Sequence, residues 1–444
     1  MRYDLHSLKT TACWFSLTLI AYAGAWHLAP SLYQVAETLL VLLFLLCCCH
    51  QSNAPLRQDT GVQVAFLLLA YILLSHLYRS LSLPDDLAQK VRFSRYYAKP
   101  MLVVMVGYGL ARSKWLSPWT FLAIIWIGLL TAIIAYNHDA IRELISAHRA
   151  SLGFLNAQHT GAVFGTALIA LVLSLPRCLH RPHKAVRHYL WLVFHALSIA
   201  VAVAIVALTQ VRAVWLGLAV CLPVGTIAHL WTSRMSAPGR GIERKAAIMA
   251  VTLVFGVLGS LAAVVDSTSL ENRVVDRLEI NKQAITNLEH AINLEPFKES
   301  SSAVRVASWA ASWEWFSERP LLGWGPGVTD DLIDQSDFFS PRFKKRFGHL
   351  HNTYLETLVA TGVLGFSLIA ALVFVVGWRA VQAFRSGAMP ADALTFAATF
   401  TAFWLTVNVF ESYIMFNSGH FIHACIGGFI YHFHLRQQIE RPTP

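Results

Sequence analysis

Long apolar runs fill most of this sequence, and short charged connectors separate each run from the next. A helix that crosses the hydrocarbon core of a bilayer needs about 20 predominantly apolar residues. Lipid offers no partner to open backbone groups, so spanning segments of this kind must be helical. The candidate spans are residues 12–28, 31–49, 61–78, 97–111, 117–136, 153–175, 188–208, 213–232, 246–265, 352–378, 391–411 and 416–435. The sequence therefore predicts an all-α polytopic membrane protein with about 12 transmembrane helices.

The charge content favours the same class. Only 14% of the residues are charged and 56% are hydrophobic, whereas a soluble domain carries about 25% charged residues. The net charge of +10 would suggest a nucleic-acid partner for a soluble chain. Here the distribution of the charge bears on topology instead, and we expect no nucleic acid as a partner. The first apolar run has no small-residue cleavage site after it, so we expect a span rather than a signal peptide.

The positions of Lys and Arg predict the orientation in the membrane. An even number of spans puts both termini on one side. If that side is cytoplasmic, it holds seventeen Lys and Arg, against eight in the opposite short connectors and span edges. This asymmetry favours cytoplasmic termini and places the long loop outside, in the periplasm of a Gram-negative cell. The predicted units are transmembrane helices one to nine at 1–265, a periplasmic loop at 266–350, and helices ten to twelve with a short cytoplasmic tail at 351–444.

The long loop has helical patterning of its own. Residues 271–294 carry apolar side chains at helical spacing. Residues 301–318 begin with serines that suit an N-cap. An aromatic face opposite charged residues is typical of a helix in the membrane interface, but the same face could pack on the ends of the spans, and the pattern leaves both open. The predicted face consists of Val306, Trp309, Trp313 and Phe316.

Several chemical signatures are missing from the sequence. None of the 7 cysteines lies in the long loop, which argues against a disulfide framework. No Gly-rich phosphate-binding loop with Lys occurs, which argues against an ATP-driven pump. No Asp-x-Asp or Glu-x-Asp pattern is present to hold a divalent metal on a diphosphate. Arginines would therefore have to supply positive charge to a phosphorylated substrate, and we expect no metal and no cofactor.

Arg212 lies between two predicted spans that have almost no connector. An arginine at membrane depth needs a partner, and no Asp or Glu is near it in the sequence. Its planar guanidinium suits bidentate contact with phosphate. An interface arginine whose side chain reaches toward water is the ordinary alternative.

Arg305 lies on the tryptophan-rich segment, and the stretch 318–327 (ERPLLGWGPG) then breaks the helix. The glycines of this stretch allow positive φ and close backbone approach. Arg305 is the second candidate for binding an anion, with a solvated charge as the alternative. Arg92 and Arg95 are candidates for contact with lipid phosphates, although anchoring in the membrane interface is the favoured explanation for them.

The stretch 348–355 (GHLHNTYL) runs into the next span at its outer end. Histidine has an unperturbed pKa of about 6.5, so His351 can accept a proton near neutral pH. Asn352 and Tyr354 could support a bound group, and a capping or interface histidine is the alternative. His349 and His351 are two residues apart and would not face each other on a helix, so we expect no zinc site there.

These stretches together resemble the O-antigen ligase and polymerase superfamily. The resemblance is carried by His351-Asn352-x-x-Leu355 followed by Gly362, and by the upstream Arg305, Trp309 and the run PLLGWGPG. The Arg212 segment is similar to the Arg-bearing span junction of the family, except that Val211 replaces the usual Ser. The layout of about 12 spans with one late periplasmic loop is also similar.

The resemblance implies a GT-C-like glycosyltransferase in the bacterial inner membrane. Its donor would be a glycan on undecaprenyl diphosphate, and the acceptor of the ligase member is lipid A-core in the periplasmic leaflet. Transfer would be metal-independent and inverting. The matching positions imply that His351 is the catalytic base, that Arg212 and Arg305 bind the diphosphate, and that His349 could assist.

Four interpretations stay open at this point. An O-antigen ligase of lipopolysaccharide biosynthesis is the first. An O-antigen polymerase shares the donor, the fold and the motifs. A protein O-oligosaccharyltransferase would usually have more soluble mass after the last span. A transporter of the lipid-linked sugar would be expected to show broken or polar helices near mid-membrane, often in related halves.

Overall fold

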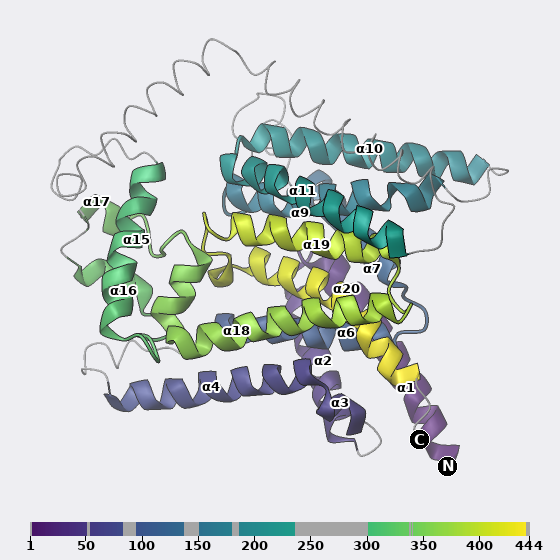
Figure 1. Cartoon of the computed structure of the whole chain (residues 1–444), viewed down its shortest axis with the longest axis horizontal. Helices are drawn as coiled ribbons and strands as arrows, with labels where there is room; N and C mark the ends of the chain where they lie inside the picture. The colour runs from purple at the N-terminus through teal and green to yellow at the C-terminus, as the bar shows by residue number, and fades with distance from the viewer. Residues whose placement is uncertain are drawn as a thin grey trace, which may run out of the picture.

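The computed structural model describes residues 2–50, 54–82, 95–136, 151–179, 186–235, 301–336, 339 and 341–440. Within these ranges the chain forms helices and no strand, as Figure 1 shows. The prediction of an all-α polytopic membrane protein is confirmed. The described helices are α1 (Arg2–Ala25), α2 (Pro30–Cys49), α3 (Ala54–Gln58), α4 (Thr60–Ser82), η2 (Arg95–Met101), α6 (Leu102–Arg112), α7 (Pro118–Tyr136), α9 (Ala157–Leu179), α10 (Val186–Thr209), α11 (Arg212–Met235), α15 (Ser301–Glu318), α16 (Thr329–Gln335), α17 (Pro341–Lys344), α18 (Thr353–Arg385), α19 (Ala391–Val407), η3 (Tyr413–Met415) and α20 (Asn417–Glu440).

Most predicted spans coincide with a described helix. Among the described residues, 7 helices are long and apolar enough to cross a membrane, namely α2, α4, α7, α9, α10, α11 and α18, and α19 is a shorter apolar helix. The span predicted at 246–265 and the loop helix predicted at 271–294 lie outside the described residues. One predicted boundary is wrong: α19 ends at Val407, so the end of the expected span 391–411 is a connector.

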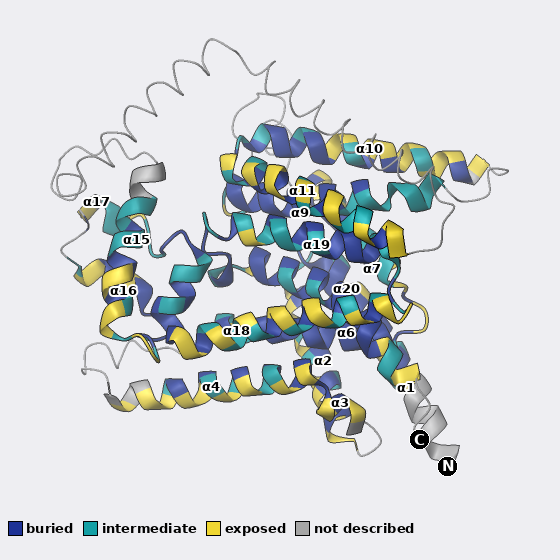
Figure 2. Ribbon diagram, viewed as in Figure 1, coloured by how far each residue is buried: buried dark blue, intermediate teal, exposed yellow. Residues whose placement is uncertain are grey.

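Burial separates inner from outer helices. Figure 2 shows α6 and α20 mostly buried, whereas α4 and α10 expose one side along their length. Every residue of α6 from Leu102 to Ala111 is buried. The exposed sides are apolar, with Leu67 and Leu74 on α4 and Leu197 on α10 each at least half exposed. Apolar side chains that face outward are what a hydrocarbon solvent requires, which fits spans in a bilayer.

Helix α18 is broken at Gly362, which has φ +61° and ψ −172°. A break inside a membrane-spanning helix would leave backbone groups without partners in lipid. The segment that follows α15 supplies them: the amides of Trp324 and Gly325 donate to the carbonyls of Val359 (2.8 Å) and Ala360 (3.0 Å). The exchange is reciprocal, because the amides after the break, Val363 and Leu364, donate to the carbonyls of Pro320 (2.8 Å) and Leu321 (3.2 Å). The glycine-rich stretch, whose glycines allow close backbone approach, therefore lies directly against the broken helix.

Substituting Gly362 with alanine should destabilise this junction. The left-handed conformation is unfavourable for a residue with a Cβ, and that Cβ would collide with the Leu321 carbonyl. We expect a loss of about 1–3 kcal/mol in unfolding free energy, seen as a lower midpoint in thermal unfolding of the detergent-solubilised protein. Gly377→Ala in the same helix is the control, because nothing lies within 4 Å of its added Cβ. Equal midpoints for the two variants would contradict this account.

Helices α15, α16 and α17 form a small unit that runs across one end of the bundle, while both chain termini lie toward the other end (Figure 1). Its core contains Ala311, Trp315, Val328, Leu332, Ile333, Phe339, Leu350 and Val359, the last of these from α18. On the predicted face of α15, Trp313 is 65% exposed, whereas Trp315, which lies outside that face, is 7% exposed. Ser308, Ala311, Ser312 and Trp315 form the buried stripe. The small residues of this stripe let α15 approach α18 closely. A sequence pattern based on aromatic residues does not predict such a stripe.

Candidate functional site

Two connectors meet at the end of the bundle that carries α15. One precedes α18 and contains His349–Asn352; the other follows α19 and spans 408–412. The backbone amide of Thr353 donates to the carbonyl of Asn408 (2.9 Å), and its hydroxyl donates to the carbonyl of Glu411 (2.9 Å). These bonds hold together two stretches that are almost 60 residues apart in the sequence.

Asn352 begins α18 as its N-cap. Its side-chain oxygen accepts from the amides of Tyr354 (2.9 Å) and Leu355 (3.2 Å), which satisfies two of the free donors at the helix start. The Tyr354 hydroxyl donates to the carbonyl of Leu405 (2.7 Å) and ties α18 to α19. Both candidate supporting residues thus fix the backbone beside His351.

Glu356 is a fully buried carboxylate in the first turn of α18. Its Oε2 accepts from the amide of Leu350 (2.8 Å) and from the hydroxyl of Ser412 (3.0 Å). One side chain therefore bonds to both connectors. Sequence reasoning did not identify Glu356, although a glutamate one helical turn after an Asn N-cap is a recognisable signal for a helix start.

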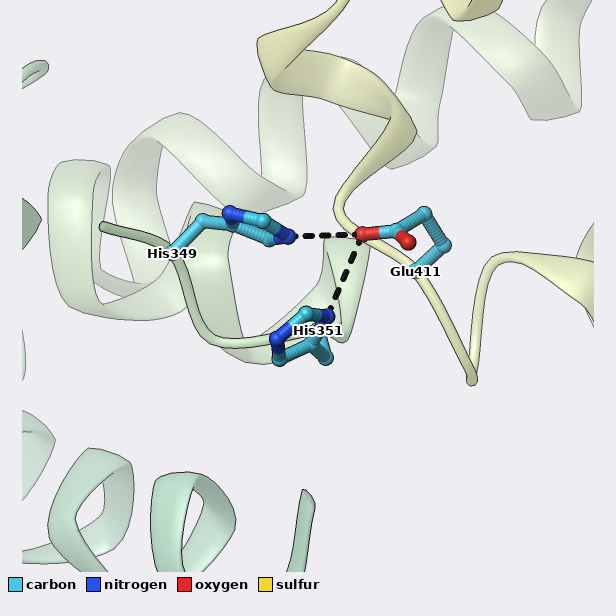
Figure 3. Close-up of side chains that lie close together, drawn as sticks. All are labelled: His349, His351 and Glu411. Carbon is cyan, nitrogen blue, oxygen red and sulfur yellow. Dashed lines mark hydrogen bonds and ion pairs between the residues drawn. The ribbon is translucent and has the colours of Figure 1, made fainter. Parts of the chain in front are cut away.

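His349, His351 and Glu411 converge in this corner, as Figure 3 shows. The Glu411 Oε1 atom lies 2.9 Å from His349 Nε2 and 3.5 Å from His351 Nδ1, and the two imidazole centroids are 4.1 Å apart. The expectation that the histidines would not face each other is wrong. It assumed a helix, but residues 349–351 lie in a connector where His351 has φ +52°.

The pKa directions of the three groups fit a charged network. Burial alone would raise the pKa of Glu411, which is 1% exposed, but His349 and His351 outweigh burial and lower it. Burial disfavours the charged form of His349, yet the hydrogen bond and charge of Glu411 raise its pKa above 6.5. Burial lowers the pKa of His351 below 6.5, and the charges of His349 and Arg305 act in the same direction. Near that pH the protonated histidine is mainly His349, and His351 is mainly neutral.

The Nε2 atom of His351, on the side of the ring away from Glu411, is the atom that could take part in catalysis. Its Nε2 is buried and has no hydrogen-bond partner among the residues that the structure describes. When Nδ1 carries the proton toward a carboxylate, Nε2 keeps its lone pair. This arrangement can accept a proton from a hydroxyl group placed next to it.

Arg305 joins the same corner from α15. Its Nε donates to the carbonyl of Phe410 (3.1 Å), and its guanidinium lies 5.9 Å from the Phe410 ring centroid. Gln158 of α9 donates from Nε2 to the same carbonyl (3.2 Å). Phe410 directly precedes Glu411, so the structure brings Arg305 next to the two histidines, and it adds Gln158, which the sequence pattern did not indicate.

Arg212 is the first residue of α11 and is exposed. The preceding turn is tight, because Gln210 adopts φ +52° directly after the end of α10. Val214, on the first turn of α11, lies against Gly161 of α9, three residues beyond Gln158. In the described part of the chain no hydrogen bond or ion pair links Arg212 to His351 or Arg305. Arg212 is therefore an exposed cation near this end of the bundle.

Arg95 lies away from this corner in the described part of the chain. Arg95 is exposed at the start of η2, and the next residue, Tyr96, stacks on His420 with centroids 5.5 Å apart. No hydrogen bond or ion pair joins Arg95 to His349, His351 or Glu411 within the described ranges. Arg92 lies outside the described residues.

The three convergent side chains could also serve as metal ligands. One donor atom from each of His349, His351 and Glu411 lies within 4.8 Å of the others. Imidazole nitrogen and carboxylate oxygen are common zinc ligands. Glu411 Oε1, however, already accepts from His349 and from the amide of Ser412 (3.0 Å). Hydrogen bonding among the three groups is enough to explain their arrangement without a metal ion. The expectation of a metal-free site stays a prediction.

The comparison with protein families agrees with this geometry. Residues 196–370 match the family model described as O-antigen ligase. The matched range begins within α10 and ends within α18, so it contains Arg212, Arg305 and His351 but not Glu411. A comparison with curated proteins gave no match. Residues 196–370 of this chain therefore form a region similar to the O-antigen ligase family.

Proposed function

We propose that this protein is an O-antigen ligase, which transfers the glycan from undecaprenyl diphosphate to lipid A-core during lipopolysaccharide biosynthesis. One observation carries the proposal: His351 presents a buried, unpartnered Nε2 beside Arg305 and backed by Glu411. A base next to a cation is what transfer of a sugar from a diphosphate to a hydroxyl requires. The match to the ligase family supports the same class of reaction.

The proposed step is a single displacement at the anomeric carbon. The acceptor hydroxyl oxygen forms a bond to that carbon, and the bond from the carbon to the phosphate oxygen breaks. The hydroxyl proton passes to His351 Nε2, and undecaprenyl diphosphate leaves with the bonding electron pair. Attack opposite the leaving group inverts the anomeric configuration.

Arg305 and Arg212 would stabilise the negative charge that grows on the leaving diphosphate. A guanidinium presents donors that match phosphate oxygens in pairs. Arg305 lies beside the His351 corner, and Arg212 is exposed at the end of a neighbouring span. The donor phosphates would then sit between the ends of the spans and α15.

The proposed location is the bacterial inner membrane, with cytoplasmic termini and a periplasmic site. Support comes from the excess of Lys and Arg predicted on the cytoplasmic side. The chain termini and the start of α18, which His351 closely precedes, also lie toward opposite ends of the bundle (Figure 1). Lipid A-core in the outer leaflet of that membrane would reach the site from the periplasmic side.

A lipopolysaccharide gel of a strain that lacks the gene tests the proposal. The deletion should reduce the ladder to bare core while polymer accumulates on the lipid carrier, and the wild-type gene should restore the ladder. Core capped with one repeat would identify a polymerase instead. An unchanged ladder would reject both and leave protein glycosylation or transport.

Chelation should have no effect on transfer. Arginines supply the positive charge in the proposed mechanism, and Glu411 Oε1 is occupied by His349 and Ser412. We therefore expect the purified protein to transfer glycan at the same rate with excess EDTA as without it. Loss of activity that added Zn²⁺ or Mg²⁺ restores would instead make the His349, His351 and Glu411 group a metal centre.

A further inference from the structure

We propose that Glu411 is a positioning residue for His351, and that His349 acts as the counter-ion that keeps this buried carboxylate in place. The inference rests on the proposed glycosyl transfer and deepens it. It concerns a residue beyond the range that matches the ligase family. The burial and the hydrogen bonds of the Glu411 carboxylate support this role.

Glu411 is 1% exposed, and a buried carboxylate is costly unless it is paired and hydrogen-bonded. Its Oε1 receives three groups: His349 Nε2 at 2.9 Å, the Ser412 amide at 3.0 Å and His351 Nδ1 at 3.5 Å. Three donors on one oxygen favour the ionised form, so Glu411 is poorly suited to accept a further proton. The carboxylate therefore acts through its neighbours and is not itself the base.

The contact with His351 has a chemical consequence. An Nδ1 atom that faces a carboxylate is the protonated nitrogen, which leaves Nε2 as the acceptor. When Nε2 takes the acceptor proton, the new imidazolium gains the charge of Glu411 as its partner. Catalytic hydrogen bonds are often long in the absence of substrate, and the 3.5 Å distance would shorten as the imidazolium forms.

His349 completes the network from the same connector. Its Nε2 donates to Oε1, and its ring meets the Phe416 ring edge-on with centroids 5.1 Å apart. That packing fixes the ring plane while its charge offsets that of Glu411. His349 and His351 thus both face Oε1 of Glu411. Because a protonated His349 cannot accept a proton, His351 is left as the proton acceptor.

The backbone places Glu411 for this role. Thr353, two residues after His351, bonds to the Glu411 carbonyl through its amide (3.2 Å) and its hydroxyl (2.9 Å). The Glu356 carboxylate holds Leu350 and Ser412, the neighbours of His351 and Glu411. The distance between imidazole and carboxylate is therefore set by the fold and does not depend on a bound substrate.

Glu411→Gln tests the inference, because glutamine keeps the shape and removes the charge. In serine-protease triads the equivalent change costs about 10⁴-fold in turnover. We expect a fall of about 10²–10⁴-fold in kcat for transfer, with little change in the KM for the lipid-linked donor. Glu411→Asp keeps the charge and should regain part of the loss. Glu314→Gln, an exposed glutamate on α15, is the control and should behave as wild type.

The pH profile separates positioning from a merely structural role. The groups that influence His351 are Glu411, His349 and Arg305, and those that act through its two partners are Asp330, Glu356 and His159. The hydrogen bond from His351 to Glu411 raises the pKa of His351 more than the charge of His349 lowers it. Removing the Glu411 charge should therefore lower this pKa, and the acid limb of kcat should move to lower pH in Glu411→Gln.

The outcomes are distinguishable. A folded Glu411→Gln protein with wild-type kcat and an unmoved acid limb, beside an inactive His351→Ala, overturns this inference and leaves the proposed function intact. A uniform loss at every pH that Glu411→Asp does not relieve also overturns it, in favour of a structural role. Absence of glycan transfer by the wild-type protein would reject the proposed function itself.

Discussion

Replacing His351 with alanine is expected to lower the rate of glycan transfer by about 10²–10⁴-fold, the usual contribution of a general base. The protein should remain folded, because Nε2 of this side chain has no partner among the described residues and the helix start is held by Asn352 and Glu356. Transfer by purified protein from the lipid-linked donor is the measurement. The control is His50→Ala, which changes an exposed histidine after α2.

The wild-type pH profile gives the same prediction a second readout. His351 acts as a base only when neutral, and burial holds its pKa below 6.5. Transfer should therefore be constant at neutral pH and fall only as the pH drops below that value. Wild-type turnover by a folded His351→Ala protein would remove His351 from the role of base.

Replacing Arg305 with alanine should give the second large loss. Removing one group that stabilises charge in the transition state typically costs about 10²–10³-fold in kcat. Arg305→Lys keeps the charge but loses the paired donors, so it should recover only part of the rate. Lys345→Ala is the matched control, since Lys345 is an exposed cation just after α17.

Donor titration shows where the Arg305 effect lies. A loss confined to KM would mean that Arg305 only helps to bind the donor. A loss in kcat means that it also stabilises the leaving diphosphate. Full activity of Arg305→Ala would contradict the proposed charge stabilisation, because Arg305 is the arginine that the structure places beside His351.

Much of the fold could be predicted because lipid imposes simple rules. Apolar length alone located the spans that became α2, α4, α7 and α18. The short run at 97–111 also forms helix, in η2 and α6, where close packing on α20 buries it. The boundary at the end of α19 was wrong because apolarity continues to Phe410, whereas the helix ends where Thr353 bonds to Asn408. Such bonds between distant segments have no signature in a hydropathy pattern.

The candidate site could be predicted in part because some of its residues are close together in the sequence. His351 and Asn352 stand in one local motif and Arg305 in another, and the resemblance of these motifs to a known family implies a base and a phosphate-binding cation. Glu411 is 60 residues away from His351, at the end of the predicted span 391–411. A glutamate at such a position is nevertheless a functional hint, because buried charge at the membrane is expensive. The pairing of His349 with Glu411 needed the connector geometry, which depends on the left-handed backbone at His351.

The most direct test of the central claim uses purified protein in liposomes with glycan on undecaprenyl diphosphate and lipid A-core as the acceptor. The products are separated by gel and by mass, with EDTA present throughout. We expect lipid A-core that carries the glycan and an equal amount of released undecaprenyl diphosphate. Longer glycan on the lipid carrier, with unmodified lipid A-core, would contradict it.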